Sequence, residues 1–256
     1  MDKHNKWLAC VQRVANPSMR LFCFHYAGGS ASFCNGWAKY LPKTVEIVSI
    51  QLPGREERFQ EPFVTDMNAL VESLATSMRR YLDVPFALFG HSMGALVCYE
   101  LARELQRRGG HEPRVLFAAG RQAPQYPEKE PLIHELPDDA FGTAFVERHA
   151  SQGLRQLFAD PEIREFFIPQ LRADIALVEK YRFDAAKPGK LSCPLVAMDC
   201  HSPPHCIDET ELAAWREHTS GEFCTYRFPG DHFFIESAAA QVLGVIAAQL
   251  ESFVTR

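Results

Sequence analysis

A serine lies between two glycines in the segment Gly90-His91-Ser92-Met93-Gly94, which has the pattern G-x-S-x-G. An apolar run precedes it over residues 85–89, and a helical pattern follows it over residues 95–108. In this setting the serine lies on a tight turn from strand to helix, where its hydroxyl stands above the edge of a sheet. Glycine is favoured on both sides because larger side chains would crowd the turn. We therefore interpret Ser92 as a nucleophile.

A serine hydroxyl attacks poorly until a base removes its proton. When the serine lies on such a turn, the partners follow in the order serine, acid, histidine, so the base is expected late in the chain. His232 fits this order because it follows an apolar run over residues 224–228 and the turn Pro229-Gly230. Two earlier histidines fit less well, because His91 cannot easily fold back onto the adjacent hydroxyl and His25 ends the first apolar run. We predict that His232 is the base.

Acyl transfer also requires N–H groups that bind the oxyanion formed during the reaction. The backbone N–H of Met93, directly after the serine, is one candidate. The segment Tyr26-Ala27-Gly28-Gly29 follows the first apolar run, and its glycines let the backbone approach a substrate closely. We predict Ala27 as the second donor. The same glycines can also shape the exit of the strand.

Strands and helices alternate along the chain in a way that would bring these groups together. The alternation indicates an α/β fold with a mostly parallel central sheet flanked by helices. Strands are predicted over residues 20–26, 45–50, 85–89, 115–119, 195–198 and 224–228, and helices over 68–82, 95–108 and 237–253.

One segment, from about residue 123 to 185, interrupts this alternation. It shows helical patterns over residues 140–149, 153–158, 161–171 and 174–181 and no clear strand. We predict a helical lid inserted between two strands of one domain that spans residues 1–256. The alternative is a helical subdomain that serves packing alone.

Composition restricts the class of protein further. The 256 residues are 46% hydrophobic and 23% charged, as in ordinary globular proteins. The net charge of −5 argues against binding to nucleic acid, and no stretch is long and apolar enough for a membrane span or a secretion signal. Several of the eight cysteines, including Cys23, Cys98 and Cys193, lie in apolar runs. We expect reduced thiols in a cytoplasmic protein.

Six segments resemble the type II thioesterases that accompany nonribosomal peptide and polyketide synthases. They are residues 24–31, 52–55, 90–94, 171–174, 214–215 and 230–233, in family order over nearly the whole chain. The resemblance implies an α/β-hydrolase fold, a helical lid and a Ser/His/Asp triad. It also implies hydrolysis of acyl groups from the phosphopantetheine arm of carrier proteins, without a cofactor. A medium-chain fatty acyl thioesterase shares these motifs, and a catalytically weakened homologue that only binds carrier proteins is a further alternative.

The catalytic acid departs from the family pattern. The family places an aspartate shortly after the fifth predicted strand, where this chain has Pro203 or Pro204, depending on the direction of counting. Asp208 is our tentative acid, although Asp208 followed by Glu211 also has the pattern of a helix capping box. Asp199, inside the strand, is a second candidate. The third alternative is a Ser/His dyad without an acid.

Two further expectations concern ligands and partners. Cys200, His201, His205 and Cys206 lie close together but lack the usual zinc spacings, so we predict no metal site. The resemblance implies that the partner carrier proteins are acidic around their modified serine, whereas this chain is itself acidic. We therefore expect recognition through a local basic patch at the lid entrance, supplemented by apolar contacts, and we also expect a monomer. The candidates are Arg148, Arg155 and Arg164, although each could simply solvate a helix face.

Overall fold

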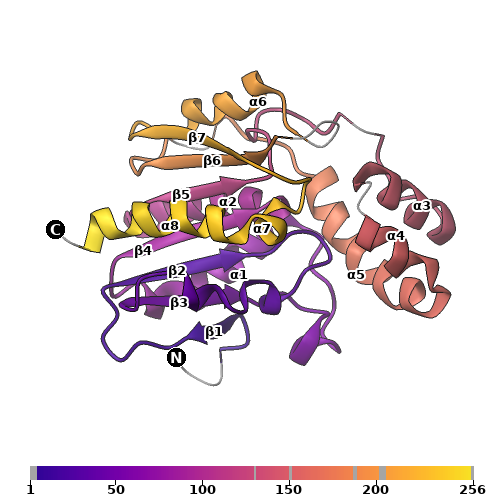
Figure 1. Cartoon of the computed structure of the whole chain (residues 1–256), viewed down its shortest axis with the longest axis horizontal. Coiled ribbons are helices and arrows are strands. Elements are labelled where there is room, and N and C mark those ends of the chain that lie inside the picture. The colour runs from indigo at the N-terminus through magenta and orange to yellow at the C-terminus, as the bar shows by residue number, and fades with distance from the viewer. Residues whose placement is uncertain (1–4, 130, 150–151, 187–188, 202–205, 255–256) are drawn as a thin grey trace.

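The computed structural model describes residues 5–129, 131–149, 152–186, 189–201 and 206–254. Strands of the described residues form one seven-stranded sheet in the order β1-β3-β2-β4-β5-β6-β7 (Figure 1). Strands β2 to β7 pair in parallel, which confirms the predicted mostly parallel sheet, and β1 joins the edge antiparallel to β3. The strands are β1 Leu8–Gln12, β2 Met19–Phe24, β3 Val45–Ile50, β4 Phe86–His91, β5 Leu116–Ala119, β6 Leu195–Cys200 and β7 Phe223–Phe228.

Helices cover both faces of this sheet. Helices α1 (Met67–Met78) and α2 (Met93–Gly109) lie behind it in the view of Figure 1, and α8 (Ala239–Val254) crosses in front. Every residue of β3, β4, β5 and β6 is buried as a result. This explains why apolar residues dominate these strands on both faces of the sheet. Two short helices, α6 (Glu209–Ala213) and α7 (Phe234–Ser237), flank β7 in the sequence.

The predicted helical insertion between β5 and β6 is present. It contains α3 (Asp138–His149), α4 (Gln152–Ala159) and α5 (Pro161–Glu179), which lie together at one end of the sheet (Figure 1, right). The insertion has a hydrophobic core of its own, formed by Ile133, Phe141, Phe145, Phe158, Ile168, Leu171 and Ile175.

The helical patterns over residues 161–171 and 174–181 belong to one continuous helix, α5, which has Pro169 inside it. The apolar pattern shifts along this helix because its two halves pack against different cores. Leu171 belongs to the core of the insertion, whereas Leu177 and Val178 belong to the main core beside α1 and α2. The C-terminal half of α5 is therefore anchored to the body of the domain.

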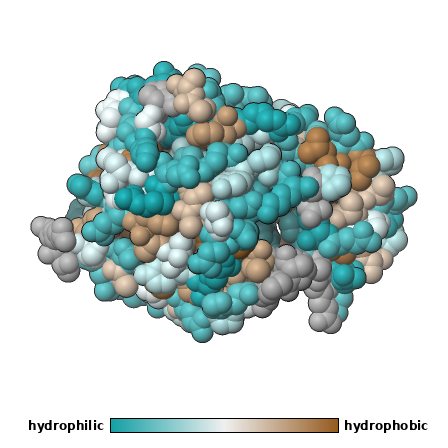
Figure 2. Space-filling model, turned by 90° about the horizontal axis from the view of Figure 1, so that it is seen from above, coloured by the Kyte–Doolittle hydropathy of each residue, from teal (hydrophilic) through white to brown (hydrophobic). Residues whose placement is uncertain are grey.

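The surface seen in Figure 2 is mainly hydrophilic, with hydrophobic patches that include one at the end formed by the insertion. Among the residues whose burial is described, the exposed large hydrophobic side chains are Tyr40, Phe59, Leu132 and Phe166. None of the helices in the described part of the chain combines the length and the apolar character that a membrane crossing requires.

Candidate active site

The turn that carries Ser92 has the predicted shape. Ser92 connects β4 to α2 with φ 56° and ψ −115°, a backbone conformation that residues other than glycine rarely adopt. Its N–H donates a 2.7 Å hydrogen bond to the carbonyl of Ala119 on the neighbouring strand. A Cβ on Gly90 would lie 2.1 Å from the carbonyl oxygen of Gly94, and one on Gly94 would lie 2.2 Å from that of Phe24. Both glycines are thus required for this strained turn.

His232 lies in the loop after β7 and lines the same cleft as Ser92. The ring of His91 packs against it, with 5.2 Å between the ring centroids. Burial and the neighbouring His232 lower the pKa of His91 well below its usual value. The Nε2 of His91 lies 2.8 Å from the backbone carbonyl of His232, and because a carbonyl can only accept, Nε2–H is the donor. His91 holds the loop of the candidate base, a contact that the sequence analysis did not foresee.

The candidate oxyanion donors belong to two different elements. Met93 begins α2, so its N–H is among the first-turn amides that have no acceptor within the helix. Ala27 lines the cleft together with Ser92 and lies in a turn closed by a 3.0 Å hydrogen bond from the Gly29 N–H to the Tyr26 carbonyl. Gly28 has φ +80° in this turn, which explains the glycine at that position.

The two carboxylates considered as the acid make other contacts. Asp208 is exposed and caps α6, where its side chain accepts a 2.9 Å hydrogen bond from the N–H of Thr210, and this bond lowers the pKa of Asp208. Asp199 is buried in β6 and accepts hydrogen bonds from the Ile207 N–H at 2.6 Å and from Arg227 at 3.0 Å. Burial raises the pKa of Asp199 to about 6, although both donors oppose the shift. Pro203 and Pro204 lie outside the described residues.

These contacts agree with the capping alternative for Asp208. We expect the variant D208N to keep kcat/KM within about threefold of the wild type and to melt at nearly the same temperature, because asparagine caps helices as well as aspartate does. Steady-state hydrolysis and thermal unfolding check this. A fall in kcat of about 10⁴ without loss of stability, the size of effect seen when a triad aspartate is neutralised, would instead assign the acid to Asp208.

The wall of the cleft contains two ion pairs. One joins Arg121 to Glu128, and the other joins Arg148 on α3 to Glu179 at the end of α5. The cavity between these side chains and Ser92 has a volume of about 60 Å³. This volume holds only a few water molecules.

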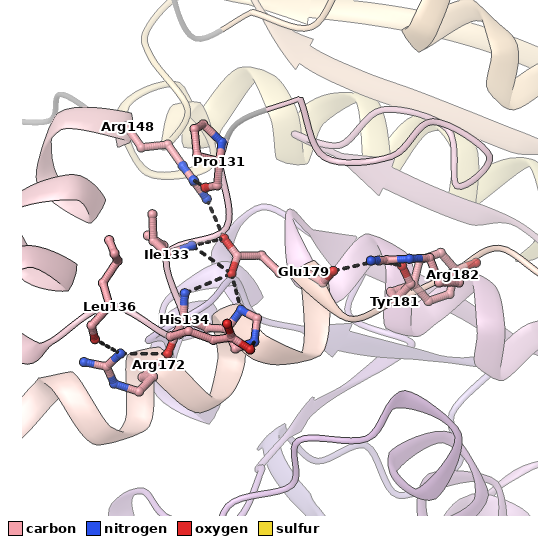
Figure 3. A network of polar contacts seen from close by, with 10 residues as sticks. Pro131, Ile133, His134, Leu136, Arg148, Arg172, Glu179, Tyr181 and Arg182 are labelled. Atoms are coloured by element: carbon pink, nitrogen blue, oxygen red, sulfur yellow. Dashed lines mark hydrogen bonds and ion pairs between the residues drawn. The ribbon is translucent and has the colours of Figure 1, made fainter.

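Glu179 is the centre of a polar network that ties α5 to the segment leading into α3 (Figure 3). Its carboxylate is 1% exposed and accepts hydrogen bonds from the N–H groups of Ile133 and His134 at 3.0 to 3.1 Å, and the His134 ring lies 2.6 Å away. Arg148 adds a bond of 3.1 Å. Burial opposes the charge on Glu179, but the hydrogen bonds from Ile133 and His134 outweigh it and lower the pKa of Glu179.

The prediction that Arg148 belongs to an exposed basic patch was wrong. Its guanidinium points inward to Glu179 and to the Pro131 carbonyl (Figure 3), because a buried carboxylate requires a cationic partner. Of the other two candidates, Arg155 is exposed, and Arg164 lies 3.2 Å from the exposed Asp139. Within the described residues, no group of three or more His, Cys, Asp and Glu side chains is arranged to hold a metal ion. His205 lies outside those residues, so the zinc prediction was not tested there.

The chain is similar to known proteins over nearly its whole length. Residues 19–250 match the model of the thioesterase domain family. The chain is 39% identical to linear gramicidin dehydrogenase LgrE of Brevibacillus parabrevis, over 97% of this chain and 94% of that protein. It is 36% identical to gramicidin S biosynthesis protein GrsT of Aneurinibacillus migulanus, over 96% and 94%. The solved structure of the type II thioesterase BorB from the borrelidin biosynthetic cluster superposes with a TM-score of 0.82 at 30% identity, covering 96% of this chain and 97% of that one.

Proposed function

The chain belongs to the thioesterase family, as a type II thioesterase with an α/β-hydrolase fold, and from this premise we propose that it hydrolyses acyl thioesters held on the phosphopantetheine arm of carrier proteins. The observation that carries the proposal is a cleft lined by Ser92, which lies on a strained turn, together with His232 and Ala27. In this role the enzyme clears stalled or wrongly primed acyl groups from a nonribosomal peptide or polyketide synthase.

The proposed reaction proceeds through an acyl-enzyme. His232 removes the proton from the Ser92 hydroxyl while its oxygen attacks the thioester carbonyl carbon. The N–H groups of Met93 and Ala27 bind the resulting oxyanion. The C–S bond then breaks, and His232 gives its proton to the departing thiolate. A water molecule, deprotonated by His232, attacks the ester on Ser92, and its cleavage releases the carboxylic acid and restores the hydroxyl.

The chain differs from the family pattern in the residue expected to orient His232, because Pro203 or Pro204 stands where the family has an aspartate. Asp208, the acid named from the sequence, is occupied as a helix cap. We propose that the hydrogen bond from His91 to the His232 carbonyl keeps the base in place.

Helices α3 and α4 pack in the insertion's own core, whereas the C-terminal half of α5 packs in the main core. We propose that α3 and α4 are the part of the lid that moves when the substrate enters, while the C-terminal half of α5 stays in place. The ion pairs in the wall favour short or polar acyl groups over long apolar ones, because an apolar chain would leave the charges desolvated beside it.

One relative, LgrE, is named a dehydrogenase, which would be a different reaction. Dinucleotide sites on α/β folds use the sequence G-x-G-x-x-G. No two of the 15 glycines in this chain are separated by a single residue. We propose no dehydrogenase activity for this chain.

We also propose a cytoplasmic location and a monomeric state. All eight cysteines are free in the structure, as expected in a reducing compartment.

The substrate proposal is tested by kcat/KM for one acyl group on a carrier protein and on a small thiol. We expect the carrier-bound substrate to be cleaved faster, with an advantage that shrinks at high ionic strength because exposed charges contribute to docking. Reversing the exposed Arg155 with R155E should reduce that advantage, whereas R80E, which alters an exposed arginine outside the insertion, should not.

Three outcomes would contradict this proposal. Equal kcat/KM for both substrates at low and high salt would remove the carrier protein as the partner. A strong preference for octanoyl over acetyl or aminoacyl groups would favour the medium-chain fatty acyl thioesterase instead. A protein that binds acyl carriers without releasing thiol would be the weakened binding homologue.

A further inference from the structure

A buried ion pair joins two segments that the mechanism does not use. Arg55 lies in the loop after β3, and Asp174 lies in the middle of α5. The guanidinium and the carboxylate form two parallel hydrogen bonds of 2.8 Å, with side chains 4% and 1% exposed. A paired geometry of this kind is specific as well as strong. Removing two charges from water is costly, so the pair requires an explanation beyond stability.

Both partners also bind the backbone turn that carries Ala27. The carboxylate of Asp174 accepts a 2.8 Å hydrogen bond from the N–H of Gly28. Arg55 donates a 2.9 Å hydrogen bond to the carbonyl of Gly29. Polar groups on both sides of the turn are therefore fixed by one ion pair.

Helix α5 adds two further contacts to the same turn. Gln170 donates a 2.9 Å hydrogen bond from its side chain to the carbonyl of Gly28. A Cβ on Gly28 would lie 3.0 Å from the Cδ1 atom of Leu171, so the helix presses closely on the turn. The turn is thus held by hydrogen bonds and by packing against α5.

We infer that Arg55 and Asp174 are positioning residues for the oxyanion hole, and this inference rests on the proposed function. Asp174 binds the N–H of Gly28, which belongs to the peptide that links Ala27 to Gly28. By fixing this peptide, the ion pair also restricts the orientation of Ala27 and therefore the direction of the Ala27 N–H. An oxyanion donor is effective only when it is fixed before the reaction. The oxyanion hole is therefore complete only while α5 is docked against the turn.

A positioning role is distinguished from a merely structural one by kinetics. The oxyanion exists in the transition state and not in the bound substrate, so a displaced donor lowers kcat and leaves KM almost unchanged. Loss of folded protein also lowers the apparent rate, but it lowers the measured concentration of folded enzyme in parallel.

The test compares two buried arginines of the same loop. Arg58 is 6% exposed, binds the Gln51 carbonyl at 2.8 Å and pairs with Glu61 at 2.6 Å. The variants R55K and R58K each keep the charge and lose a guanidinium. We expect R55K to lower kcat by about 10- to 100-fold, less than the loss of a whole oxyanion donor, with KM within about threefold. R58K should keep kcat near the wild-type value per folded molecule, although both variants unfold at a lower temperature.

A second variant avoids a change of charge. Q170M removes the bonds from Gln170 to the turn, and we expect a smaller fall in kcat, again with KM unchanged. Each enzyme is assayed with an acyl carrier protein and with p-nitrophenyl acetate, because the oxyanion hole serves both substrates. If the wild type hydrolyses p-nitrophenyl acetate but not the acyl carrier protein, the proposed substrate is wrong. The role of Arg55 and Asp174 is then still tested by the kcat values measured with the ester.

The inference is overturned if R55K keeps kcat within threefold of the wild type, or if R55K raises KM at unchanged kcat. It is also overturned if R55K and R58K lose activity equally per folded molecule.

Discussion

The variant S92A is expected to lose at least about 10⁴ in kcat for thioester hydrolysis and to keep the melting temperature of the wild type. In subtilisin, removing the serine or the histidine of the triad costs about 10⁶, which sets the scale. The side chain of Ser92 is half-buried in the cleft, so the loss of its hydroxyl opens no cavity in the core. Steady-state assays and thermal unfolding measure the two quantities.

The matched control for this variant is S73A, which alters a serine of α1 that is half-buried like Ser92. It should leave the kinetics unchanged. Turnover by S92A within tenfold of the wild type would remove Ser92 from the mechanism, and a large fall in melting temperature would show that the serine also supports the fold.

The variant H232Q is expected to show a loss of similar size, because a serine without its base remains protonated. The two residues act as one unit, so the double variant S92A/H232Q should be no slower than S92A alone. His111 is exposed in the loop after α2 and provides the control H111Q.

Additive losses in the double variant would contradict this account, because they would mean that His232 contributes independently of Ser92. A fall of less than tenfold in H232Q would show that another group serves as the base.

Features with a local physical cause could be predicted from the sequence. Gly90 is required because a Cβ there would meet the backbone of Gly94 and Ala95, so this requirement acts over a few consecutive residues. The buried parallel strands were visible as mainly apolar segments because helices cover both faces of the sheet. The order of the reactive residues along the chain is enough to select His232.

Features that depend on distant pairing could not be predicted in the same way. Arg55 and Asp174 are 119 positions apart in the sequence, and no periodic pattern connects them. The one available signal is a charged residue within an apolar helical stretch, as Asp174 is before Ile175 and Glu179 is after Val178. Such residues are buried only when a partner compensates the charge.

Two errors have the same origin. Arg148 was expected to face solvent, but its direction depends on Glu179, a residue 31 positions away in the sequence. The edge strand β1 was missed because its pairing with β3 is also a long-range contact, and its five residues give a weak pattern of their own.

The most direct test of the central claim is a measurement of the acyl-enzyme by mass spectrometry. The protein is mixed with an acyl carrier protein, quenched with acid within the first turnover and digested into peptides. The account predicts an added acyl mass on the peptide that contains residues 90–94, located at Ser92, and no such adduct in S92A. Release of thiol and carboxylic acid by the wild type with the acyl group on another residue, or with no covalent adduct at any time point, would contradict it.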